Sequence, residues 1–388
     1  MTWLVAFLLA PFALLATFFV AEVLWGLKRP SEAHPPSPAR SAIVAIPAHD
    51  EASVIADTIR SLTTALSEGI GILVIADNCS DDTADLARSA GAQVLERHNM
   101  EQRGKGFALA FAAEHLQANP PEVFAVLDAD CRIDRASLRA LVDSAASSGR
   151  PAQAINLLRP DRNSSPLVQI STFAFMLKNL VRQRGLQRLA RRVHLTGTGM
   201  AMPYQLFRAS RGVRASIVED LALGLELSNA GHPPMLVSAA NVWSSGSTYR
   251  GTLTQRRRWE GGYIATAFRH GPQEVMRGIK SADARAIFAG LDLMLPPLAL
   301  FAFLNAIVLA VAAVATAAFG LHWWPVAAQA SLLLLGLLAV FAAWLREGRD
   351  FISLGVLVRL PLYILWKLPM YLGLARRGAP SEWLRTGR

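Results

Sequence analysis

The central part of the chain alternates short apolar runs with longer amphipathic stretches. Residues 72–76 and 123–127 are continuous apolar runs with the length of buried strands. The full pattern predicts strands over residues 41–47, 72–76, 93–96 and 123–127, and helices over residues 52–66, 81–90 and 107–117. Because strands that alternate with helices form a mostly parallel sheet covered by helices, we expect an α/β fold. Ligands of such sheets bind at the carboxyl ends of the strands.

The two ends of the chain are more apolar than its middle. Residues 3–27 contain one charged residue, Glu22, and residues 293–319 and 323–345 are also long apolar stretches. Each of these three stretches is long enough to cross a membrane as a helix. A cleaved signal peptide is the alternative for the first stretch. It fits poorly, because no basic residues precede the stretch and the stretch is too long.

A further apolar stretch, residues 351–374, differs in character. It contains prolines and basic residues, namely Arg359, Pro361, Lys367 and Pro369. These residues fit a re-entrant or interfacial segment better than a spanning helix. We therefore divide the chain into three parts: an N-terminal transmembrane helix (1–28), an α/β domain with interfacial helices (29–283), and a C-terminal membrane region with two spanning helices and the segment just described (284–388).

Basic residues beside the apolar stretches predict their orientation. Lys28 and Arg29 follow the first stretch, and Arg346 and Arg349 follow the last spanning one, whereas residues 320–322 contain no lysine or arginine. Positively charged connections remain on the cytoplasmic side of a membrane. We therefore expect a protein of the bacterial inner membrane whose α/β domain faces the cytoplasm.

Composition narrows the class of partner. The chain is 52% hydrophobic, which is high for a soluble enzyme, and its formal net charge of +10 suits an anionic lipid surface. Nucleic acid is the other common partner of a basic protein, but we expect none, because membrane segments flank the domain and no nucleic-acid motif occurs. Cys79 and Cys131 are the two cysteines, so a disulfide framework is not expected and a reducing cytosol is the simpler setting.

Asp128 and Asp130 close the fourth predicted strand with the string Asp-Ala-Asp. If the strand continued through them, both carboxylates would lie on one face, because strand side chains alternate. Two carboxylates at the carboxyl end of a parallel strand can hold a hard divalent cation and, through it, a diphosphate. The alternative is a turn or a helix cap, in which such strings also occur.

Two other phosphate-binding folds do not fit. A dinucleotide-binding domain needs a glycine-rich turn after the first strand, but Pro47-Ala48-His49-Asp50-Glu51 follows it here. A Walker A loop needs an earlier glycine and a following serine or threonine, and residues 104–106 (Gly-Lys-Gly) lack both.

Further candidate residues lie at strand and helix ends. Asp77 ends the second predicted strand, where its carboxylate can accept a hydrogen bond from a nucleobase. Lys105 lies between two glycines at a helix start, which suits a phosphate or base contact as well as ordinary helix entry. Glu219 and Asp220 open an amphipathic helix. Acids at that position usually offset the helix dipole, and the functional alternative is a general base for an attacking hydroxyl.

Two segments near the C-terminal membrane region complete the set. Gln255, Arg258 and Trp259 share one helical face, where an arginine can bind a diphosphate and a tryptophan can stack on a sugar. The arginines of this segment also fit a contact with lipid headgroups. Residues 196–200 (Thr-Gly-Thr-Gly-Met) form a plain turn or part of a site. They follow a basic stretch, residues 178–192, which we expect on the membrane surface, holding the phosphate of a lipid-linked acceptor.

Taken in this order, these residues resemble family 2 of the inverting glycosyltransferases, in the membrane-bound branch of cellulose and hyaluronan synthases and exopolysaccharide glycosyltransferases. The resemblance covers residues 43–259. It implies a GT-A fold, which is a Rossmann-like, mostly parallel sheet, with transmembrane helices at both termini and interfacial helices. It also implies a nucleotide-sugar donor, usually a UDP-sugar, and Mg²⁺ or Mn²⁺.

The resemblance also implies roles for single residues. Asp130 would ligate the metal together with Asp128, and Asp220 would be the catalytic base, with Glu219 beside it. The donor would contact Pro47, Asp50, Glu51, Asp77, Lys105 and Asp128. The acceptor and the diphosphate would contact Gly197, Thr198, Gly199, Gln255, Arg258 and Trp259.

The chain departs from the family's sequence pattern at two positions, and one of these departures bears on the length of the product. Asp50 stands where the family commonly has asparagine, and Val218 where processive synthases have threonine. The second departure and the small number of membrane segments favour addition of one sugar. We therefore expect transfer to a polyprenyl-diphosphate-linked acceptor in exopolysaccharide synthesis, alongside partner proteins of a polysaccharide assembly system. The alternatives are a processive β-polysaccharide synthase, a ceramide-type lipid glucosyltransferase, and an inactive nucleotide-sugar-binding membrane scaffold.

Overall fold

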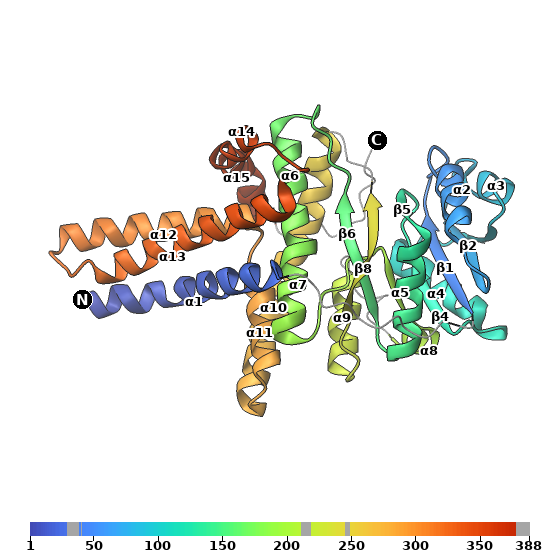
Figure 1. The fold of residues 1–388 in the computed structure, drawn as a ribbon, viewed down its shortest axis with the longest axis horizontal. Coiled ribbons are helices and arrows are strands. Elements are labelled where there is room, and N and C mark those ends of the chain that lie inside the picture. Colours follow the sequence, from blue (N-terminus) through green and yellow to red (C-terminus); the bar gives the residue numbers. More distant parts are fainter. Residues whose placement is uncertain (29–38, 40, 211–218, 245–248, 378–388) are drawn as a thin grey trace.

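The chain folds into a sheet domain and a projecting bundle of long helices (Figure 1). The computed structural model describes residues 1–28, 39, 41–210, 219–244 and 249–377, with the side chains of residues 249–258 and 377 left aside. The apolar stretches of both termini form the projecting bundle, and the central part of the chain forms the sheet domain. The separation into two parts therefore follows the hydrophobic pattern of the chain.

Within the described residues, eight strands form one sheet in the order β3-β2-β1-β4-β7-β6-β8-β5. Their bounds are β1 (Ala42–Ala48), β2 (Ile70–Asp77), β3 (Gln93–Arg97), β4 (Val123–Val126), β5 (Cys131–Ile133), β6 (Ala152–Leu158), β7 (Met200–Pro203) and β8 (Met235–Ser244). The first four strands in this order are parallel, as the alternation of strands and helices predicted. β7 is antiparallel to both β4 and β6, and β5 is antiparallel to β8.

The helices fall into three groups by position. Those of the sheet domain are α2 (Ile55–Ala65), α3 (Thr83–Ser89), α4 (Lys105–His115) with the short η1 (Leu116–Ala118), α5 (Arg135–Ser148), α8 (Tyr204–Ala209) and α9 (Glu219–Asn229). Those at the junction are α6 (Pro166–Met176), the π-helix η2 (Leu177–Arg182), α7 (Gln183–Ala190), α10 (Tyr249–Ser281) and α11 (Ala284–Met294). The terminal helices are α1 (Thr2–Gly26), α12 (Leu298–Ala318), α13 (Trp324–Ala343) with η4 (Trp344–Gly348), α14 (Leu354–Leu357) and α15 (Leu360–Arg377).

Separate apolar clusters cover the two faces of the sheet. On one face, Ile46 of β1 packs in a cluster with Ile59 of α2 and Leu138 of α5. On the other, Phe124 of β4 packs with Leu109 of α4. Both faces of the parallel strands are thus buried, which explains why their sequences are continuous apolar runs and do not alternate.

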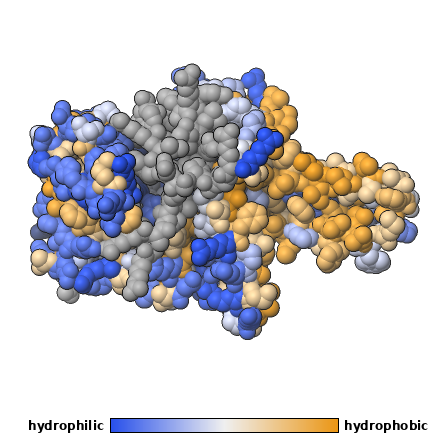
Figure 2. All heavy atoms as spheres, turned by 180° about the vertical axis from the view of Figure 1, so that it is seen from behind, coloured by the Kyte–Doolittle hydropathy of each residue, from blue (hydrophilic) through white to orange (hydrophobic). Residues whose placement is uncertain are grey.

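Three helices of the described residues are long and apolar enough to cross a membrane. They are Thr2–Gly26, Leu298–Ala318 and Trp324–Gly348. Figure 2 shows these helices as an apolar projection beside a sheet domain whose visible surface is largely hydrophilic. The helices α14 and α15, which contain most of the predicted interfacial stretch, do not belong to this set.

A buried ion cluster joins the terminal helices to the junction. Arg182 of η2 donates to Glu22 of α1, with 2.6 Å between Nε and Oε2, and to Asp292 of α11, with 2.5 Å between its NH2 nitrogen and Oδ1. The second oxygen of Asp292 lies 2.5 Å from Nε2 of His194. All these side chains are largely buried. A buried charge is tolerated only when it is paired, so this cluster fixes α1, η2 and α11 in one arrangement.

We predict that Arg182→Met destabilises the protein by about 3–5 kcal/mol, because it leaves the buried carboxylates of Glu22 and Asp292 without their cation. Thermal and denaturant unfolding in detergent micelles would measure the loss. The control is Arg60→Met, which removes an exposed pair with Asp57 and should cost less than about 1 kcal/mol. Equal unfolding temperatures for the two variants would contradict the prediction.

Candidate active site

The carboxyl ends of β2, β1 and β4 lie side by side at one edge of the sheet, because the three strands are parallel neighbours. β1 carries Pro47 near its end and is followed by Asp50, β2 ends at Asp77, and Asp128 follows β4. The structure therefore collects at one edge several residues that were predicted from separate parts of the sequence. Ligands of α/β sheets bind at this kind of edge.

Asp77 is held by a cation that sequence reasoning missed. The guanidinium of Arg97 donates to Oδ1 of Asp77 at 2.6 Å, and both side chains are buried. Nδ2 of Asn78 donates to the same oxygen at 3.0 Å. Asp77 and Arg97 are direct partners in the register of β2 and β3. A basic residue ending the neighbouring parallel strand was the signal that could have revealed this pair.

Asp50 ties the loop after β1 to the loop after β2. Its Oδ1 accepts hydrogen bonds from the backbone N–H of Ser80 at 2.7 Å and from the hydroxyl of the same residue at 3.1 Å. The next residue, Glu51, donates its backbone N–H to Oγ1 of Thr83 at 2.8 Å. Asp50 has φ +53°, a left-handed conformation that asparagine and aspartate adopt most readily. An aspartate at position 50, where the family commonly has asparagine, is therefore compatible with the local backbone conformation.

The strand that precedes the Asp-Ala-Asp string is shorter than the sequence predicted. β4 ends at Val126, and residues 128–130 lie in a turn in which the N–H of Cys131 donates to the carbonyl of Asp128 at 3.0 Å. The assumption that strand alternation sets the direction of the two carboxylates was wrong. The tight turn nevertheless brings them together, so the predicted proximity is found for a different reason.

Three possible ligand atoms, two from carboxylates and one from a thiol, lie close together at this turn. One carboxylate oxygen each from Asp128 and Asp130 and the thiol of Cys131 lie within 4.8 Å of one another. Burial, with the nearby charges of Asp130 and Asp128, raises the pKa of Cys131, so the thiol keeps its proton. Protonated thiols are poor metal ligands, whereas carboxylates suit Mg²⁺ and Mn²⁺. The side chains present therefore fit a hard divalent cation bound by Asp128 and Asp130.

Lys105 lies at the centre of the acidic residues. Its ammonium pairs with Asp128 and also donates to the carbonyl of Gly197 at 2.7 Å. Burial acts against its charge, but Asp128, Glu219 and Asp220 together raise the pKa of Lys105 above its usual value. The lysine predicted to contact a phosphate or base thus first balances the charge of the acids around it.

The glycine-rich loop allows Asp220 to approach this lysine. Gly197 has φ +81°, and a Cβ placed on it would lie 3.1 Å from Oδ2 of Asp220 and 3.3 Å from Nζ of Lys105. Gly199 has φ +60°, and a Cβ there would lie 2.5 Å from Val242. A side chain would therefore clash at Gly199, and at Gly197 it would push on Asp220 and Lys105 while adopting a backbone conformation that favours glycine. The loop is shaped for close packing against the acids and is more than a plain turn.

A buried glutamine holds the glycine-rich loop, and sequence reasoning missed it. Nε2 of Gln153 in β6 donates to the carbonyls of Thr198 at 2.9 Å and Gly199 at 3.1 Å, and its Oε1 accepts from the N–H of Thr196 at 2.9 Å. The hydroxyl of Thr198 accepts from the N–H of Asp128 at 3.0 Å. The glycine-rich loop and the acidic turn are therefore linked directly. Gln153, a polar residue inside an apolar strand, was the sequence signal that could have revealed the residue that holds the loop.

The acids at the start of α9 have perturbed pKa values. Burial and the charge of Asp220 raise the pKa of Glu219 to about 7, although Lys105 acts in the opposite direction. Burial also raises the pKa of Asp220, and the charges of Lys105 and Lys178 partly offset this. A carboxyl group whose pKa approaches the working pH is suited to accept a proton in catalysis. Val218, which precedes this pair, lies outside the described residues.

The helical segment with Gln255 and Arg258 belongs to α10, but those two side chains lie outside the described part of the chain. Their roles stay predictions. Trp259 is described, and its ring packs against that of Phe175 in α6, with 5.9 Å between centroids. Glu260, the next residue, is buried and accepts from Lys367 and from the hydroxyl of Tyr371, both in α15. α15 therefore helps to fix the position of this segment.

The basic stretch 178–192 does not lie on a surface as a whole, contrary to expectation. Arg192 is buried and pairs with Glu274 at 2.8 Å, and the side chain of Arg182 is only 11% exposed. Arg184 pairs with Glu347 of η4 at 2.9 Å. Lys178 differs, because it is exposed and its ammonium lies 4.5 Å from the ring centre of Tyr263. The arginines of this stretch mainly join parts of the protein, and Lys178 faces the site.

A four-stranded parallel unit with acids at its carboxyl edge is the architecture of GT-A glycosyltransferases. The model of a family described as glycosyltransferase like family 2 matches residues 38–262, which is more than half of the chain. The chain therefore belongs to this family and is a glycosyltransferase of the nucleotide-sugar-dependent type. The predicted GT-A fold is confirmed.

One solved structure has a similar fold over nearly the whole chain. The mannosyltransferase PcManGT from Pyrobaculum calidifontis, in complex with GDP-Man and Mn²⁺, is 16% identical with a TM-score of 0.57, over 95% of this chain and 100% of that one. Glucosyl-3-phosphoglycerate synthase from Mycobacterium tuberculosis, in complex with Mn²⁺, UDP and phosphoglyceric acid, is 17% identical with a TM-score of 0.40, over 58% and 78% of the two chains. The same enzyme has also been solved with Mg²⁺ and UDP. The comparison with curated proteins gave no match.

The proximity of Lys178 to Asp220 predicts a pH effect. If Asp220 is the catalytic base, it loses this function as the pH falls through its raised pKa, so kcat/KM should decrease on the acid side. Lys178→Gln removes a cation that lowers the pKa of Asp220, so the acid limb should move to higher pH. pH–rate profiles of the two proteins measure the shift. Arg60→Gln, a distant exposed cation, should leave the profile in place, and a Lys178→Gln limb at unchanged or lower pH would contradict the prediction.

Proposed function

We propose that this protein is a membrane-bound inverting glycosyltransferase that moves one sugar from a nucleotide-sugar, expected to be a UDP-sugar, to a lipid-linked acceptor. One observation carries the proposal: the carboxylate of Asp220 lies against Gly197 and Lys105, beside the acidic turn of Asp128 and Asp130. A proton acceptor and a candidate diphosphate site thus lie next to each other at the carboxyl edge of the sheet.

The chemistry follows from this arrangement. Asp220 removes the proton from the acceptor hydroxyl while the oxygen attacks the anomeric carbon of the donor. The bond from that carbon to the diphosphate breaks, and the nucleoside diphosphate leaves with the electron pair. Attack from the side opposite the leaving group inverts the anomeric centre, so an α-linked donor gives a β-linked product. Glu219 shares the buried negative charge, and Lys105 balances it.

The leaving diphosphate carries the charge that needs stabilising. Asp128 and Asp130 would hold Mg²⁺ or Mn²⁺, which would neutralise developing charge on the phosphate oxygens. At the nucleoside end, Asp50 and Asp77 would meet the base and ribose. Gln255, Arg258 and Trp259 would meet the diphosphate and the acceptor.

A membrane-embedded acceptor suits the position of the site. Lys178 faces Asp220 from η2, and η2 is joined through Arg182 to the terminal helix α1. With α1, α12 and α13 crossing the inner membrane, the sheet edge would face the cytoplasmic leaflet, where a polyprenyl diphosphate presents its hydroxyl or sugar. Exopolysaccharide synthesis, with partner proteins of an assembly system, is the expected setting.

The alternatives differ in their products. A processive β-polysaccharide synthase would give long products on a gel, and the three candidate spanning helices of the described residues are few for a polysaccharide channel. A ceramide-type glucosyltransferase would accept a lipid without phosphate. An inactive scaffold would bind a donor from the panel UDP-Glc, UDP-Gal, UDP-GlcNAc and GDP-Man without transferring or hydrolysing it. The proposed enzyme should hydrolyse one of these donors slowly with Mn²⁺ present.

We predict that Asp220→Asn lowers the transfer rate by about 10²- to 10⁴-fold, because the amide cannot accept the proton of the acceptor hydroxyl. Donor binding, measured by calorimetry, should remain. Asp85→Asn, at an exposed position on α3, is the matched control and should keep full activity. A near-normal rate in a folded Asp220→Asn variant would remove the base assignment.

The metal assignment predicts a specific loss of Mn²⁺ binding. Asp130→Asn should weaken Mn²⁺ binding in the presence of UDP by at least about tenfold, because it removes one of two carboxylate ligands. Mn²⁺ electron paramagnetic resonance measures this directly, without turnover. The control is Asp81→Asn, because Asp81 belongs to a second acid–thiol cluster with Asp50 and Cys79. Equal losses in both variants, or full activity in excess EDTA, would refute the assignment.

A further inference from the structure

Arg132 is a partly buried cation that no acid of the described residues neutralises. It is the middle residue of β5, two positions after Asp130. The NH1 nitrogen of its guanidinium group is buried and has no hydrogen-bond partner. Arg184 is the other cation of the described residues with such a nitrogen, but it pairs with Glu347. A buried donor without a partner costs free energy, so Arg132 is suited to bind an anion that comes from outside the chain.

The start of β5 lies at the same edge of the sheet as the candidate active site. β7 is antiparallel to β4 and to β6, and β6 is parallel to β8, so β4, β6 and β8 all end at this edge. β5 is antiparallel to β8 and pairs Cys131 with Ser244, the last residue of β8. Arg132 therefore lies one residue inside the edge. Asp77 and Asp50, the acids expected to contact the nucleoside, lie toward the opposite end of the edge, at β2 and β1.

Arg132 lies on the face of the sheet that is turned toward the junction helices. Its direct partner in β8 is Trp243, and directly opposed residues of antiparallel strands share a face. Trp243 packs against a cluster that contains Phe173 of α6 and Phe18 of α1, whereas Cys131 packs in the cluster on the other face. Figure 1 shows α6 and α7 between the sheet and the projecting helices. The guanidinium group of Arg132 is thus on the side from which the terminal helices project.

A second cation borders the same place. The backbone N–H of Arg159 donates to the carbonyl of Ser244 at 3.0 Å, so the pairing of β6 with β8 continues one residue beyond the end of β6. Alternation along the strand places Arg159 on the face of Leu157, the partner of Trp243. Its side chain is exposed. Arg132 and Arg159 therefore flank the end of β8 from its two neighbouring strands, which are about 10 Å apart.

Apolar rings lie beside these cations, toward the terminal helices. The ring of Trp243 is only partly buried and stacks on that of Phe351, with 6.5 Å between centroids. Phe351 and Ile352 precede α14 and are buried in the same cluster as Phe18 of α1. A phosphate that carries an apolar chain would therefore find a cation at Arg132 and apolar contacts next to it.

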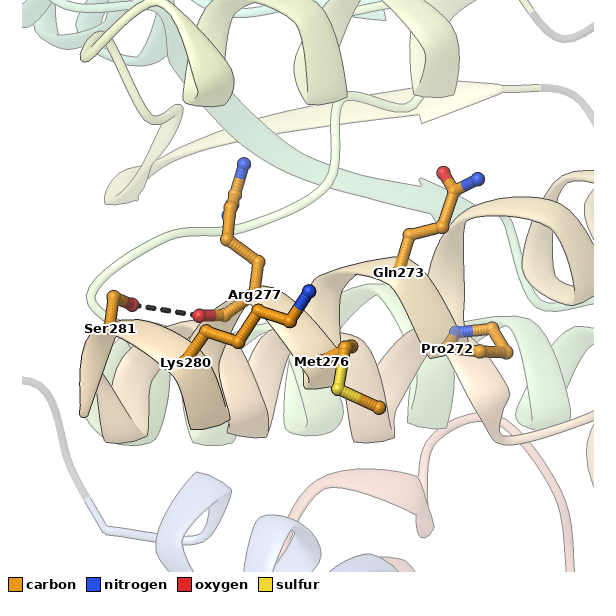
Figure 3. Close-up of a pocket in the computed structure, with 6 residues that line it drawn as sticks. All are labelled: Pro272, Gln273, Met276, Arg277, Lys280 and Ser281. Carbon is orange, nitrogen blue, oxygen red and sulfur yellow. Dashed lines mark hydrogen bonds between the residues drawn. The ribbon is translucent and has the colours of Figure 1, made fainter.

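The hollow on α10 does not offer the same chemistry. It has a volume of about 650 Å³, and Figure 3 shows its lining residues, Pro272, Gln273, Met276, Arg277, Lys280 and Ser281. All six are exposed, and Arg277 donates to Glu274 and to Asn229. Because exposed cations keep their water, the hollow lacks the desolvated charge that distinguishes Arg132.

We propose that Arg132, assisted by Arg159, binds the phosphate of the lipid-linked acceptor. This inference rests on the proposed function and adds to it the residues that recognise the acceptor. A guanidinium group binds phosphate oxygens through two parallel N–H bonds, and the neighbouring rings suit an apolar chain, so the ligand class is a phosphate or diphosphate ester of an apolar alcohol. The diphosphate of the donor is the other phosphate at this edge. The acceptor is favoured because Arg132 lies toward the junction helices, on the far side of β4 from Asp77.

Binding of a prenyl diphosphate tests the proposal on the full chain in detergent micelles, without glycosyl transfer. The probe is tritiated farnesyl diphosphate, and EDTA is present so that no divalent cation can hold the diphosphate at Asp128 and Asp130. Arg132→Gln should weaken binding about 10- to 100-fold, because the phosphate loses a charged hydrogen-bond donor. Farnesol, which has the same chain without phosphate, should bind to both proteins equally.

Two further variants separate binding from structure. Arg135→Gln is the matched control, because Arg135 is an exposed cation at the start of α5 that donates to the carbonyl of Thr64, and it should bind farnesyl diphosphate like the wild type. Arg159→Gln changes an exposed residue, so it tests the same site without risk to folding, and it should weaken binding about threefold. Arg132→Gln should not lower the unfolding temperature of the unliganded protein, because the NH1 nitrogen that is lost had no partner.

Three results would overturn the proposal. The first is unchanged binding of farnesyl diphosphate in Arg132→Gln; unchanged binding in Arg159→Gln alone would overturn the part assigned to Arg159. The second is an equal loss in Arg135→Gln, which means that the overall positive charge attracts the probe. The third is a loss of Mn²⁺ binding in the presence of UDP in Arg132→Gln as large as its loss of farnesyl diphosphate binding, which would assign Arg132 to the donor.

The proposed function can fail separately from this inference. Binding of farnesyl diphosphate that depends on Arg132, in a protein that transfers no sugar, would support the inference and refute the proposed function. Transfer to a prenyl-diphosphate acceptor with the same KM in the wild type and in Arg132→Gln would refute the inference and support the proposed function.

Discussion

The buried guanidinium of Arg182 is the constraint on which the arrangement of this protein depends. It binds two carboxylates that are far apart in the sequence, Glu22 in the first helix and Asp292 in α11. Asp292 in turn contacts His194, two residues before the glycine-rich loop of the site. None of these charges can be buried alone, so the terminal helix, the junction and the start of the loop must assemble together. The sheet edge with the candidate site is thereby placed beside the projecting helices.

A second balance of charge operates at the site itself. Asp128, Glu219 and Asp220 would repel one another at this density, and Lys105 is the cation that keeps them together. The same balance determines how readily these carboxyl groups take up a proton, because burial raises the pKa values of Glu219 and Asp220 while Lys105 limits the rise. The glycine-rich loop leaves room for these groups, since a Cβ on Gly197 would press on both Asp220 and Lys105.

Basic residues of the junction have different tasks, although they look alike in the sequence. Arg182 and Arg192 neutralise buried acids and hold elements together. Lys178, which is exposed, lowers the pKa of Asp220, the proposed base. The degree of burial distinguishes these cations. A buried cation has lost its water and needs a fixed partner inside the protein, whereas an exposed one is available to a ligand or a lipid surface.

The sequence by itself determined the first four strands and the helices between them, the acids at the strand ends and the apolar terminal helices. These features depend on local patterns, because hydrophobic periodicity and the length of an apolar stretch are properties of neighbouring residues.

The sequence did not determine which charged side chains pair with each other. Glu22 and Arg182 are 160 residues apart, Lys105 and Gly197 are 92 apart, and Gln153 reaches a loop 45 residues away. Such pairs depend on the packing of whole elements, so the partners of Asp77, Lys105 and Arg182 were decided only by the tertiary structure. The Asp-Ala-Asp string shows both kinds of information. Its position was predicted from the sequence, but its carboxylates are brought together by a tight turn and not by the predicted strand.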